Sequence, residues 1–233
     1  MRRMRILMIV TAALLLAAAA SFTLLKAMGG NEDSGEPPKA ATEDDEKLSF
    51  RYKEQPMLGD PDAPVKIVEF GDYRCIVCYR FDQKFFPKLK EQFIDTGKAA
   101  FYFVNDPILG KGSVRIALAA ESVYHRRPDA FWDYHEAIYA NQGPEDEAWA
   151  TTDFLVQLAA ETVPEIDRQT LRRDIEEGTY LQAVKRDAEK AQALGIEGTP
   201  TVYVNGRMLT WDETSHYDQL SQIISAAYEK AAN

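Results

Sequence analysis

The chain has 233 residues, which is enough for one sizeable domain with additional segments. Hydrophobic residues (45%) and charged residues (27%) occur in the proportions of a globular protein, which excludes wholesale disorder and a collagen-like structure. A net charge of −10 argues against nucleic-acid binding, and two cysteines are too few for a disulfide-stapled scaffold.

The N-terminus has the pattern of a membrane anchor. Three arginines among the first five residues precede an uncharged, mostly apolar run over residues 6–25. A helix needs roughly 20 apolar residues to cross a bilayer, and flanking arginines stay on the cytoplasmic side. We therefore expect residues 1–28 to form a single-pass anchor in the cell membrane, with the remainder on the extracytoplasmic side. The alternative is a signal peptide cleaved near the alanines at 17–20.

An acidic segment follows the apolar run. Residues 29–47 are rich in Gly, Pro, Ser, Glu and Asp and contain no large apolar residue. Such a composition cannot bury enough apolar surface to offset the chain entropy lost on ordering. We therefore expect residues 29–54 to form a flexible tether.

The next part of the chain alternates strand and helix. Residues 65–70 are mostly apolar and β-branched and predict a strand, and residues 99–104 predict a second one. Between them, apolar side chains recur every three or four residues from Cys75 to Gly97, which predicts a helix. Pro87 lies inside this pattern and is expected to kink the helix.

Only helical patterns occur between residues 113 and 194. Ser113 is expected to cap the first helix and Gly195 to end the last one. The predicted helices cover residues 113–126, 130–139, 152–161, 167–177 and 180–194.

Strand patterns return after this helical region. Residues 201–204 and 207–209 flank Asn205-Gly206, which is a strong signal for a two-residue hairpin turn. A final amphipathic helix is expected over residues 217–231. The order of elements predicts an α/β sheet with a helical insertion.

The two cysteines carry the strongest chemical signal. Cys75-Ile76-Val77-Cys78 lies where a strand and a short loop lead into a helix. Free backbone N–H groups and the helix dipole favour a thiolate at a helix N-terminus, so we expect a lowered pKa for Cys75. The spacing allows Cys78 to close a small disulfide ring. We predict Cys75 to be the exposed nucleophile and Cys78 the buried resolving thiol.

Three alternatives to a redox role for the cysteine pair stay open at this point. One is a structural disulfide, although closing so short a loop stabilises a protein by only about 2 kcal/mol. A zinc site would need two further ligands, and the spacing of His125, His135 and His216 does not suit such ligands. We expect each of these histidines to be a surface or packed residue. The third alternative is a chance pairing of two inert cysteines.

A proline before a late strand supports redox chemistry. Thr199-Pro200 precedes the strand at 201–204, and a proline that opens a strand leaves a backbone edge free for another peptide. A cis bond before Pro200 would turn the Thr199 backbone groups toward the cysteines.

A glutamate in the first strand is a candidate for proton transfer. Glu69 precedes Cys75 by six residues and points into an apolar strand region. A buried carboxyl there would have a raised pKa and could exchange protons with Cys78. The alternative is an exposed glutamate on an edge strand.

Three features thus occur together: Glu69-Phe-x-x-x-x-Cys75-x-x-Cys78, a helical insertion, and a late Thr199-Pro200 followed by a strand. This combination resembles the DsbA family of thiol–disulfide oxidoreductases, over roughly residues 55–231. The segments that are most similar to the Gram-positive, membrane-anchored BdbD branch are PVKIVEFGDY (64–73), FWDYHEAIY (131–139) and TPTVYVN (199–205).

The resemblance implies a thioredoxin-like fold with an inserted all-helical subdomain. Residues 55–112 and 195–233 would form the thioredoxin-like domain, and residues 113–194 the insertion. It also implies that Pro200 is cis. The implied partners are unfolded or partly folded exported proteins with free thiols, and a quinone-linked membrane thiol oxidase similar to DsbB or BdbC. The chemistry requires no cofactor.

The dipeptide between the cysteines departs from the family pattern. The family usually has proline followed by His, Ser or Ala, whereas this chain has Ile76 and Val77. Neither side chain offers a cation or a hydrogen bond to a thiolate. The resemblance therefore leaves the strength of the oxidant undetermined.

The BdbD branch also resembles proteins with a calcium site remote from the cysteines. Carboxylate, amide and carbonyl oxygens are the ligands that calcium prefers. The residues at matching places are Gln55, Glu121, Ser122 (through its carbonyl) and Asp187.

We therefore expect an extracytoplasmic thiol–disulfide oxidoreductase that introduces disulfides into exported proteins. Its catalytic residues are predicted to be Cys75, Cys78, Glu69, Thr199 and Pro200. One alternative is a reductase or isomerase of exported disulfides, since the motif does not set the direction. Another is a non-catalytic thioredoxin-fold module that binds unfolded chains.

Overall fold

The computed structural model describes residues 50–145 and 148–232. The predicted anchor (1–28) and most of the predicted tether (29–54) lie outside these ranges. Within the described ranges, no helix is both long enough and apolar enough to cross a bilayer. The anchor therefore stays a prediction.

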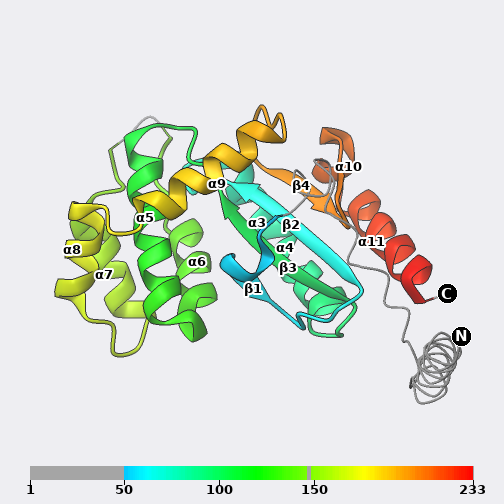
Figure 1. Ribbon diagram of the computed structural model, residues 1–233, viewed down its shortest axis with the longest axis horizontal. Coiled ribbons are helices and arrows are strands. Elements are labelled where there is room, and N and C mark those ends of the chain that lie inside the picture. Colours follow the sequence, from blue (N-terminus) through cyan, green and yellow to red (C-terminus); the bar gives the residue numbers. More distant parts are fainter. Residues whose placement is uncertain (1–49, 146–147, 233) are drawn as a thin grey trace, which may run out of the picture. The chain divides into compact units, whose positions relative to one another are not determined.

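A five-stranded sheet with the order β1-β3-β2-β4-β5 forms the centre of the domain (Figure 1). β2 (Val65–Gly71) and β3 (Ala99–Asn105) run parallel in its middle, and both strand predictions are confirmed. All side chains of these strands except Lys66 are buried, as expected for strands covered on both faces. The antiparallel outer strands are β1 (Met57–Leu58), β4 (Thr201–Val204) and β5 (Arg207–Met208).

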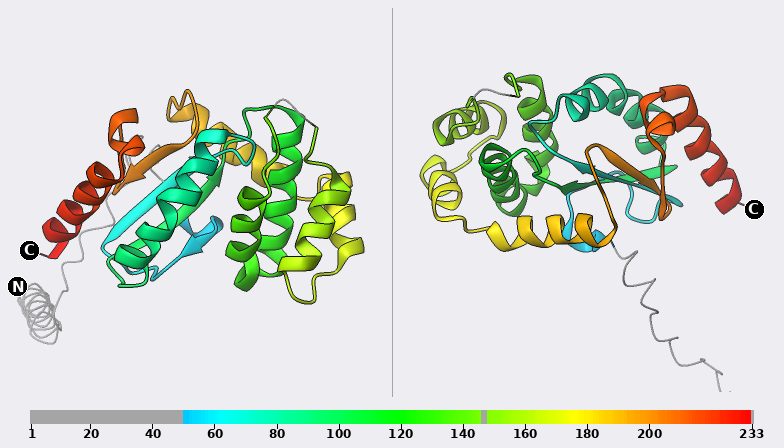
Figure 2. Two further views of the ribbon diagram at one scale, coloured as in Figure 1. Left: turned by 180° about the vertical axis from the view of Figure 1, so that it is seen from behind. Right: turned by 90° about the horizontal axis from the view of Figure 1, so that it is seen from above.

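Helices cover both faces of the sheet (Figure 2). On one face, Ile67 and Phe101 pack in a core that includes Phe81, Phe86 and Leu220. On the other face, Val68, Phe70 and Tyr203 pack with Phe50 and with Ala191 of α9. Three helices pack on the sheet in the first core, namely α3 (Ile76–Lys84), α4 (Phe86–Leu89) and α11 (Tyr217–Ala232), and helices of the insertion extend this core. On the other face, α9 spans Leu181–Ala193.

The helix predicted from Cys75 to Gly97 is divided into three pieces. α3 ends at Lys84, α4 follows with Pro87 in its first turn, and a π-helix covers Lys90–Ile94. Proline is tolerated in a first turn because the backbone N–H that it lacks has no intrahelical partner there. The predicted kink is therefore confirmed as a break between two helices.

The insertion contains helices throughout, as predicted. Their bounds are α5 (Lys111–Arg126), α6 (Phe131–Ala140), α7 (Thr152–Thr162), α8 (Arg168–Glu177) and α9. The capping role predicted for Ser113 is wrong. α5 begins earlier because Gly110, with φ 85°, occupies the N-cap, and Ser113 is buried within the first turn.

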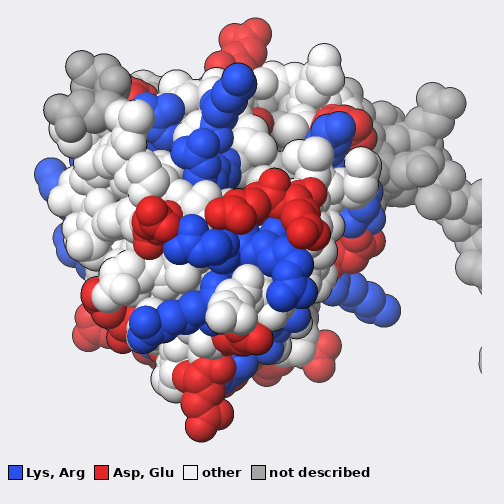
Figure 3. Space-filling view, turned by 90° about the vertical axis from the view of Figure 1, so that its left-hand side faces the viewer, with Lys and Arg blue, Asp and Glu red and all other residues white. Residues whose placement is uncertain are grey.

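The outer end of the insertion carries charges of both signs (Figure 3). Arg172 of α8 pairs with Asp153 of α7 at 2.6 Å, and Arg126 of α5 pairs with Asp174 of α8 at 2.6 Å. The Arg172–Asp153 pair is exposed and contributes about 1 kcal/mol or less, whereas Asp174 is buried and Arg126 compensates its charge.

The folded domain begins before the predicted end of the tether. Phe50 is buried against Phe70 and Tyr203, with ring centroids 6.2 and 5.0 Å apart, and a 3-10 turn covers Tyr52–Glu54. Residues 50–54 therefore pack on the sheet. Two short elements were also not predicted, namely β1 and α10 (Trp211–Ser215), which Thr210 caps.

Candidate active site

The dithiol lies where the loop after β2 leads into α3. Cys75 is the N-cap of α3, and its backbone N–H donates to the Asp72 carbonyl at 3.0 Å. The Asp72 carboxylate accepts from the backbone N–H groups of Arg74 at 2.8 Å and Leu109 at 2.9 Å. Asp72 therefore fixes the loop that presents the first cysteine.

The two cysteines differ in exposure. Both are free thiols, and Cys75 keeps 8% of its surface exposed whereas Cys78 keeps none. Cys75 is the more exposed of the two, as predicted, but its exposed fraction is much smaller than predicted. The reason is that Gln142 donates to the Cys75 carbonyl at 3.1 Å and Thr199 approaches the sulfur. The neighbouring Ile76 is 41% exposed.

The environment of Cys75 favours its thiolate. A hydrogen bond from the Cys78 thiol is the largest cause of a lowered pKa, and it outweighs the opposing effect of burial. Thr199 and the backbone N–H groups of Val77 and Cys78 lower the pKa further, to about 6. The prediction of a lowered pKa is thus confirmed, and hydrogen bonds supply what Ile76 and Val77 do not.

Cys78 is placed to stay protonated. Burial is the largest cause of its raised pKa, followed by the hydrogen bond with Cys75 and the charge of Glu69. The pair therefore contains one thiol that ionises easily and one that does not. This asymmetry has the direction expected if Cys75 is the nucleophile and Cys78 the resolving thiol, and these roles stay a prediction.

Glu69 lies on the central strand β2, between Phe103 of β3 and Val202 of β4. It is buried, so the alternative of an exposed edge-strand glutamate is wrong. Its pKa is raised well above the ordinary value by burial, then by the charges of Asp82 and Cys75. Its Oε1 atom has no hydrogen-bond partner among the described residues. A buried carboxyl with a raised pKa therefore lies close enough to the dithiol for its charge to act on Cys78.

Thr199 and Pro200 are far from the dithiol in the sequence but close to it in the fold. The peptide bond between them is cis, as the resemblance implied. The Cys75 thiol donates to the Thr199 carbonyl, with the two atoms 3.3 Å apart. The structure therefore brings together four of the five predicted catalytic residues and places Pro200 at the edge of the same site.

A groove of about 370 Å³ runs beside α3 and α10. Its apolar side chains include Pro200 and Trp211, and the indole of Trp211 is 62% exposed. The sequence analysis missed this residue, although a tryptophan just after the strand pair at 201–209 was a detectable signal. The remaining lining residues are Val77, Arg80, Phe81, Lys84, Phe85, Thr214 and Ser215.

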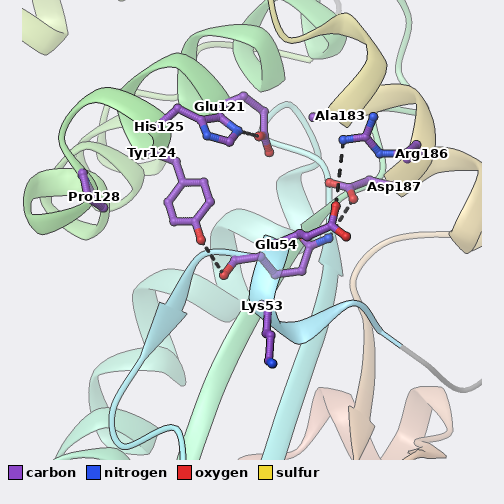
Figure 4. Close-up of a pocket in the computed structure, with 10 residues that line it drawn as sticks. Lys53, Glu54, Glu121, Tyr124, His125, Pro128, Ala183, Arg186 and Asp187 are labelled. Atoms are coloured by element: carbon purple, nitrogen blue, oxygen red, sulfur yellow. Dashed lines mark hydrogen bonds and ion pairs between the residues drawn. The ribbon is translucent and has the colours of Figure 1, made fainter.

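Three of the four predicted calcium ligands also come together. Gln55, Glu121 and Asp187 line a pocket of about 360 Å³ between α5, α9 and the segment before β1 (Figure 4). Gln55 donates to Asp187 at 2.8 Å, and Asn105 donates to Glu121 at 2.9 Å. The ligand predicted at Ser122 is its carbonyl, which stays a prediction, while the hydroxyl of Ser122 donates to Asp174.

The titratable groups of this pocket do not form a metal site by themselves. No group of three or more His, Cys, Asp or Glu side chains within residues 50–145 and 148–232 is arranged to hold a metal ion. Burial and the Glu121 charge raise the pKa of Asp187 to about 7. Two carboxylates in one buried site therefore repel each other.

The histidines occupy surface or packed positions, as predicted. His125 stacks on Tyr180 with ring centroids 4.6 Å apart, His216 is exposed, and His135 is fully buried. His135 contacts Tyr73 and Asp82, two residues that the sequence analysis missed. The spacing of Asp82 four residues after Cys78 was an available signal, because it places both on one helix face.

Known proteins are similar to this chain in sequence. A sequence model of the thioredoxin family matches residues 51–226. The probable disulfide bond formation protein D of Bacillus cereus is 38% identical over 181 residues, which cover 78% of this chain and 82% of that protein. The disulfide bond formation protein D of Bacillus subtilis is 40% identical over 172 residues, covering 74% of this chain and 76% of that protein.

Solved structures agree with the sequence relatives. The crystal structure of oxidised BdbD from Bacillus subtilis superimposes with a TM-score of 0.73 at 39% identity and covers 76% of this chain and 94% of its own. DsbA from Chlamydia trachomatis gives a TM-score of 0.69 at 27% identity, with 76% and 93% covered. The fold, the dithiol geometry and these relatives together establish that the chain belongs to the thioredoxin family, as a DsbA-like thiol–disulfide oxidoreductase.

Proposed function

We propose that the enzyme introduces disulfides into exported proteins on the extracytoplasmic side of the cell membrane. The observation that carries the direction is the asymmetry of the thiols, since the pKa of Cys75 is lowered to about 6 and that of Cys78 is raised. A stabilised thiolate favours the reduced enzyme and so makes its disulfide form a stronger oxidant. Electrons then pass from substrate thiols to the enzyme.

The catalytic cycle has two exchange steps. A substrate thiolate attacks the Cys75 sulfur of the oxidised enzyme, the bond between Cys75 and Cys78 breaks, and the electron pair moves onto the Cys78 sulfur. Glu69 supplies the proton that this buried sulfur takes up. A second substrate thiolate then attacks the substrate sulfur of the mixed disulfide and releases Cys75 as a thiolate. The substrate leaves with a disulfide, and the enzyme has gained two electrons.

Apolar surface next to Cys75 supports unfolded chains as substrates. Large apolar side chains are exposed between the two cysteines, at Ile76, and just after β4, at Met208 and Trp211. Unfolded chains expose apolar side chains that folded proteins bury, so such a surface selects them. Pro200, at the start of β4, leaves a backbone edge to which an extended segment can add.

Each turnover leaves both cysteines reduced, so an electron acceptor has to restore the disulfide. We infer that a quinone-linked membrane thiol oxidase similar to DsbB or BdbC takes the two electrons. The apolar run at residues 6–25 supports this partner, because an anchor would hold the domain at the membrane. Mixed-disulfide trapping of Cys78→Ala in membranes, followed by identification of the linked membrane protein, tests this step.

The reduction potential against glutathione tests the direction. A value near the strong oxidants, about −120 mV, is expected, whereas a value near that of thioredoxin, about −270 mV, would support a reductase.

A folding assay tests the alternative of a non-catalytic module that binds unfolded chains. If Cys75→Ala, Cys78→Ala chains still promoted folding of exported thiol proteins as well as wild type, binding and not exchange would be the function.

Membrane fractionation tests the location. Full-length protein is expected to stay in the membrane fraction after alkaline washing, with its catalytic domain open to protease added outside. A mature N-terminus within or just after residues 17–28, found by mass analysis, would support a cleaved signal peptide. Protection of the domain from external protease would contradict the extracytoplasmic proposal.

We also propose a structural calcium ion in the pocket between α5 and α9. The buried donors fit a hard cation: Glu121 and Asp187 supply carboxylates, and Gln55 Oε1 and Asn105 Oδ1 have no hydrogen-bond partner among the described residues. When bound, the ion would neutralise two carboxylates that otherwise repel each other. The ion would link two parts of the thioredoxin-like domain, β3 and the segment before β1, to the helical insertion. It would take no part in the exchange reaction.

The midpoint temperature of thermal unfolding, measured with calcium and with a chelator, tests calcium binding. Calcium is expected to raise the midpoint of the wild type above that in chelator, and to leave that of Asp187→Asn unchanged. Asp174→Asn removes a buried carboxylate of the insertion outside the pocket and serves as the matched control. An equal effect of calcium on wild type and Asp187→Asn would contradict this site.

A further inference from the structure

The groove beside α3 and α10 carries positive charge that the catalytic cycle does not use. Arg80 and Lys84 line it from α3, and both side chains are exposed. The other lining residues are apolar or carry a hydroxyl, so the groove has two cations and no carboxylate. The chain as a whole has a net charge of −10. The groove is therefore opposite in charge to the rest of the protein.

Neither cation is neutralised by the part of the chain that the structure describes. Within residues 50–145 and 148–232, no ion pair or hydrogen bond joins the side chain of Arg80 or Lys84 to another residue. Arg207, on the hairpin before α10, is by contrast paired with Glu213 at 3.1 Å. Two like charges one helical turn apart destabilise a helix slightly unless a partner neutralises them. Both cations are thus free to pair with a ligand.

The groove begins at the dithiol. Val77, which lies between the two cysteines, and Pro200 both line it. The Thr199 carbonyl, one residue before Pro200, lies 3.3 Å from the Cys75 sulfur. A chain that brings its own cysteine to Cys75 therefore has its next residues at the mouth of the groove. On the wall opposite α3, the exposed indole of Trp211 offers an apolar contact.

The positions of the two cations along α3 set a spacing for such a chain. Arg80 and Lys84 follow Cys75 by five and nine residues. At a helical rise of 1.5 Å per residue, they lie about 7.5 and 13.5 Å along α3 from the first cysteine. An extended chain advances about 3.3 Å per residue, so its second and fourth residues after the cysteine come level with the two cations. Side chains at alternate positions of an extended chain lie on one side, which is also the side of the cysteine.

We propose that Arg80 and Lys84 select acidic substrate segments, with carboxylates about two and four positions from the reacting cysteine. The side chains at the intervening positions then face Trp211 and favour apolar residues. This inference rests on the proposed function and names the class of unfolded chain that the enzyme prefers. The two cations attract and align the segment before exchange, and they disfavour lysine-bearing segments by repulsion. They take no part in the exchange chemistry itself.

Cysteine peptides test this preference in the first exchange step with the oxidised full-length enzyme. Three peptides have one cysteine and the same apolar residues, and carry Glu, Gln or Lys two and four positions to either side of the cysteine. Each rate constant is divided by the fraction of peptide present as thiolate, because neighbouring charges change the pKa of the peptide thiol. Wild type should react about three- to tenfold faster with the Glu peptide than with the Gln peptide at low salt, and slowest with the Lys peptide. High salt should reduce the preference.

Charge variants assign the preference to the two cations. Combining Arg80→Gln with Lys84→Gln should bring the ratio of the Glu to the Gln rate close to one, and combining Arg80→Glu with Lys84→Glu should invert it. Lys185→Glu makes the same change of charge at an exposed position of α9, outside the groove, and should keep the wild-type ratio. The uncharged thiol 2-mercaptoethanol should react equally with wild type and the double Gln variant, which shows that the dithiol is intact.

The outcomes separate this inference from the proposed function. Equal rates of wild type with the Glu and Gln peptides would overturn the acidic preference and leave the oxidase function standing. Failure of the oxidised enzyme to react with any of the peptides would overturn both.

The acidic run at residues 43–46 of the same chain is a competing occupant of the groove. If it filled the groove, wild type would show no preference, and a preference for the Glu peptide would appear once the four acids of this run were replaced by their amides. That result would assign the cations to the chain's own segment and overturn their role in choosing substrates.

Discussion

Replacing Cys78 by alanine should raise the pKa of the thiol that remains. The hydrogen bond from the Cys78 thiol is the largest of the causes that lower the pKa of Cys75 to about 6. Alanine removes this donor and leaves the helix N-terminus and the approach of Thr199 in place. The variant therefore separates the contribution of the second thiol from that of the backbone.

The expected size of the change follows from the ionised fractions. At pH 7 a thiol with a pKa of about 6 is roughly 90% ionised, whereas one with the ordinary value of 9.0 is roughly 1% ionised. A hydrogen bond to a charged group is worth about 1.5 to 3 kcal/mol, and one pKa unit corresponds to about 1.4 kcal/mol. The pKa of Cys75 should thus rise by at least one unit, and the ionised fraction at pH 7 should fall to about half or less.

Ultraviolet absorbance of the thiolate, followed as a function of pH, measures this shift. Cys78→Ser is the matched control, because its hydroxyl can donate in place of the thiol and should restore part of the lowered pKa. Titration of Cys78→Ala at the wild-type pH would refute the reasoning. It would mean that the backbone of α3 and Thr199 alone stabilise the thiolate.

Three further predictions concern the same site. Cys75→Ala should abolish thiol oxidation, whereas Cys78→Ala should accumulate mixed disulfides on non-reducing gels, and equal trapping by both would contradict the division of roles. Because the pKa of Cys75 is lower in the folded protein than the ordinary 9.0, its ionisation stabilises the reduced protein fully above about pH 9, and this contribution is lost as pH falls through about 6. The difference in thermal midpoint between reduced wild type and Cys75→Ser should therefore shrink from about pH 9 to pH 5, and a constant difference would count against the lowered pKa. Trp211→Ala should slow oxidation of unfolded protein substrates several-fold while leaving the rate with glutathione unchanged, since only a chain fills the groove, and equal losses on both substrates would argue against docking there.

The parts of the site that the sequence predicted depend on local patterns. Cys75 at the start of a helix, the apolar strands around Glu69 and the hairpin at Asn205-Gly206 can each be recognised within about ten residues. The family resemblance added the cis bond before Pro200, which composition and spacing do not determine. Element type was predictable for the same reason, because the helices of the insertion have clear apolar periodicity.

The parts that were missed depend on contacts between distant segments. His135 meets Tyr73 across 62 positions of the chain, and nothing in the local pattern of either residue indicates the other. β1 has only two residues, which is too short to show an alternation of apolar and polar side chains. Phe50 follows a polar segment in the sequence, and only the fold shows that its ring packs against Phe70 and Tyr203. The low exposure of Cys75 likewise arises from Gln142 and Thr199, which approach from other parts of the fold.

The contact between the Cys75 thiol and the Thr199 carbonyl joins positions 124 residues apart. Contacts of such long range form late, because the entropy of closing a long loop has to be overcome first. A chain that emerges from the N-terminus onward therefore presents its dithiol well before the strand that covers it has been delivered. A chain with more cysteines would then risk wrong pairings, but this one has only two. Any intramolecular disulfide formed during that delay is the native one, so premature oxidation leaves the enzyme in its working form.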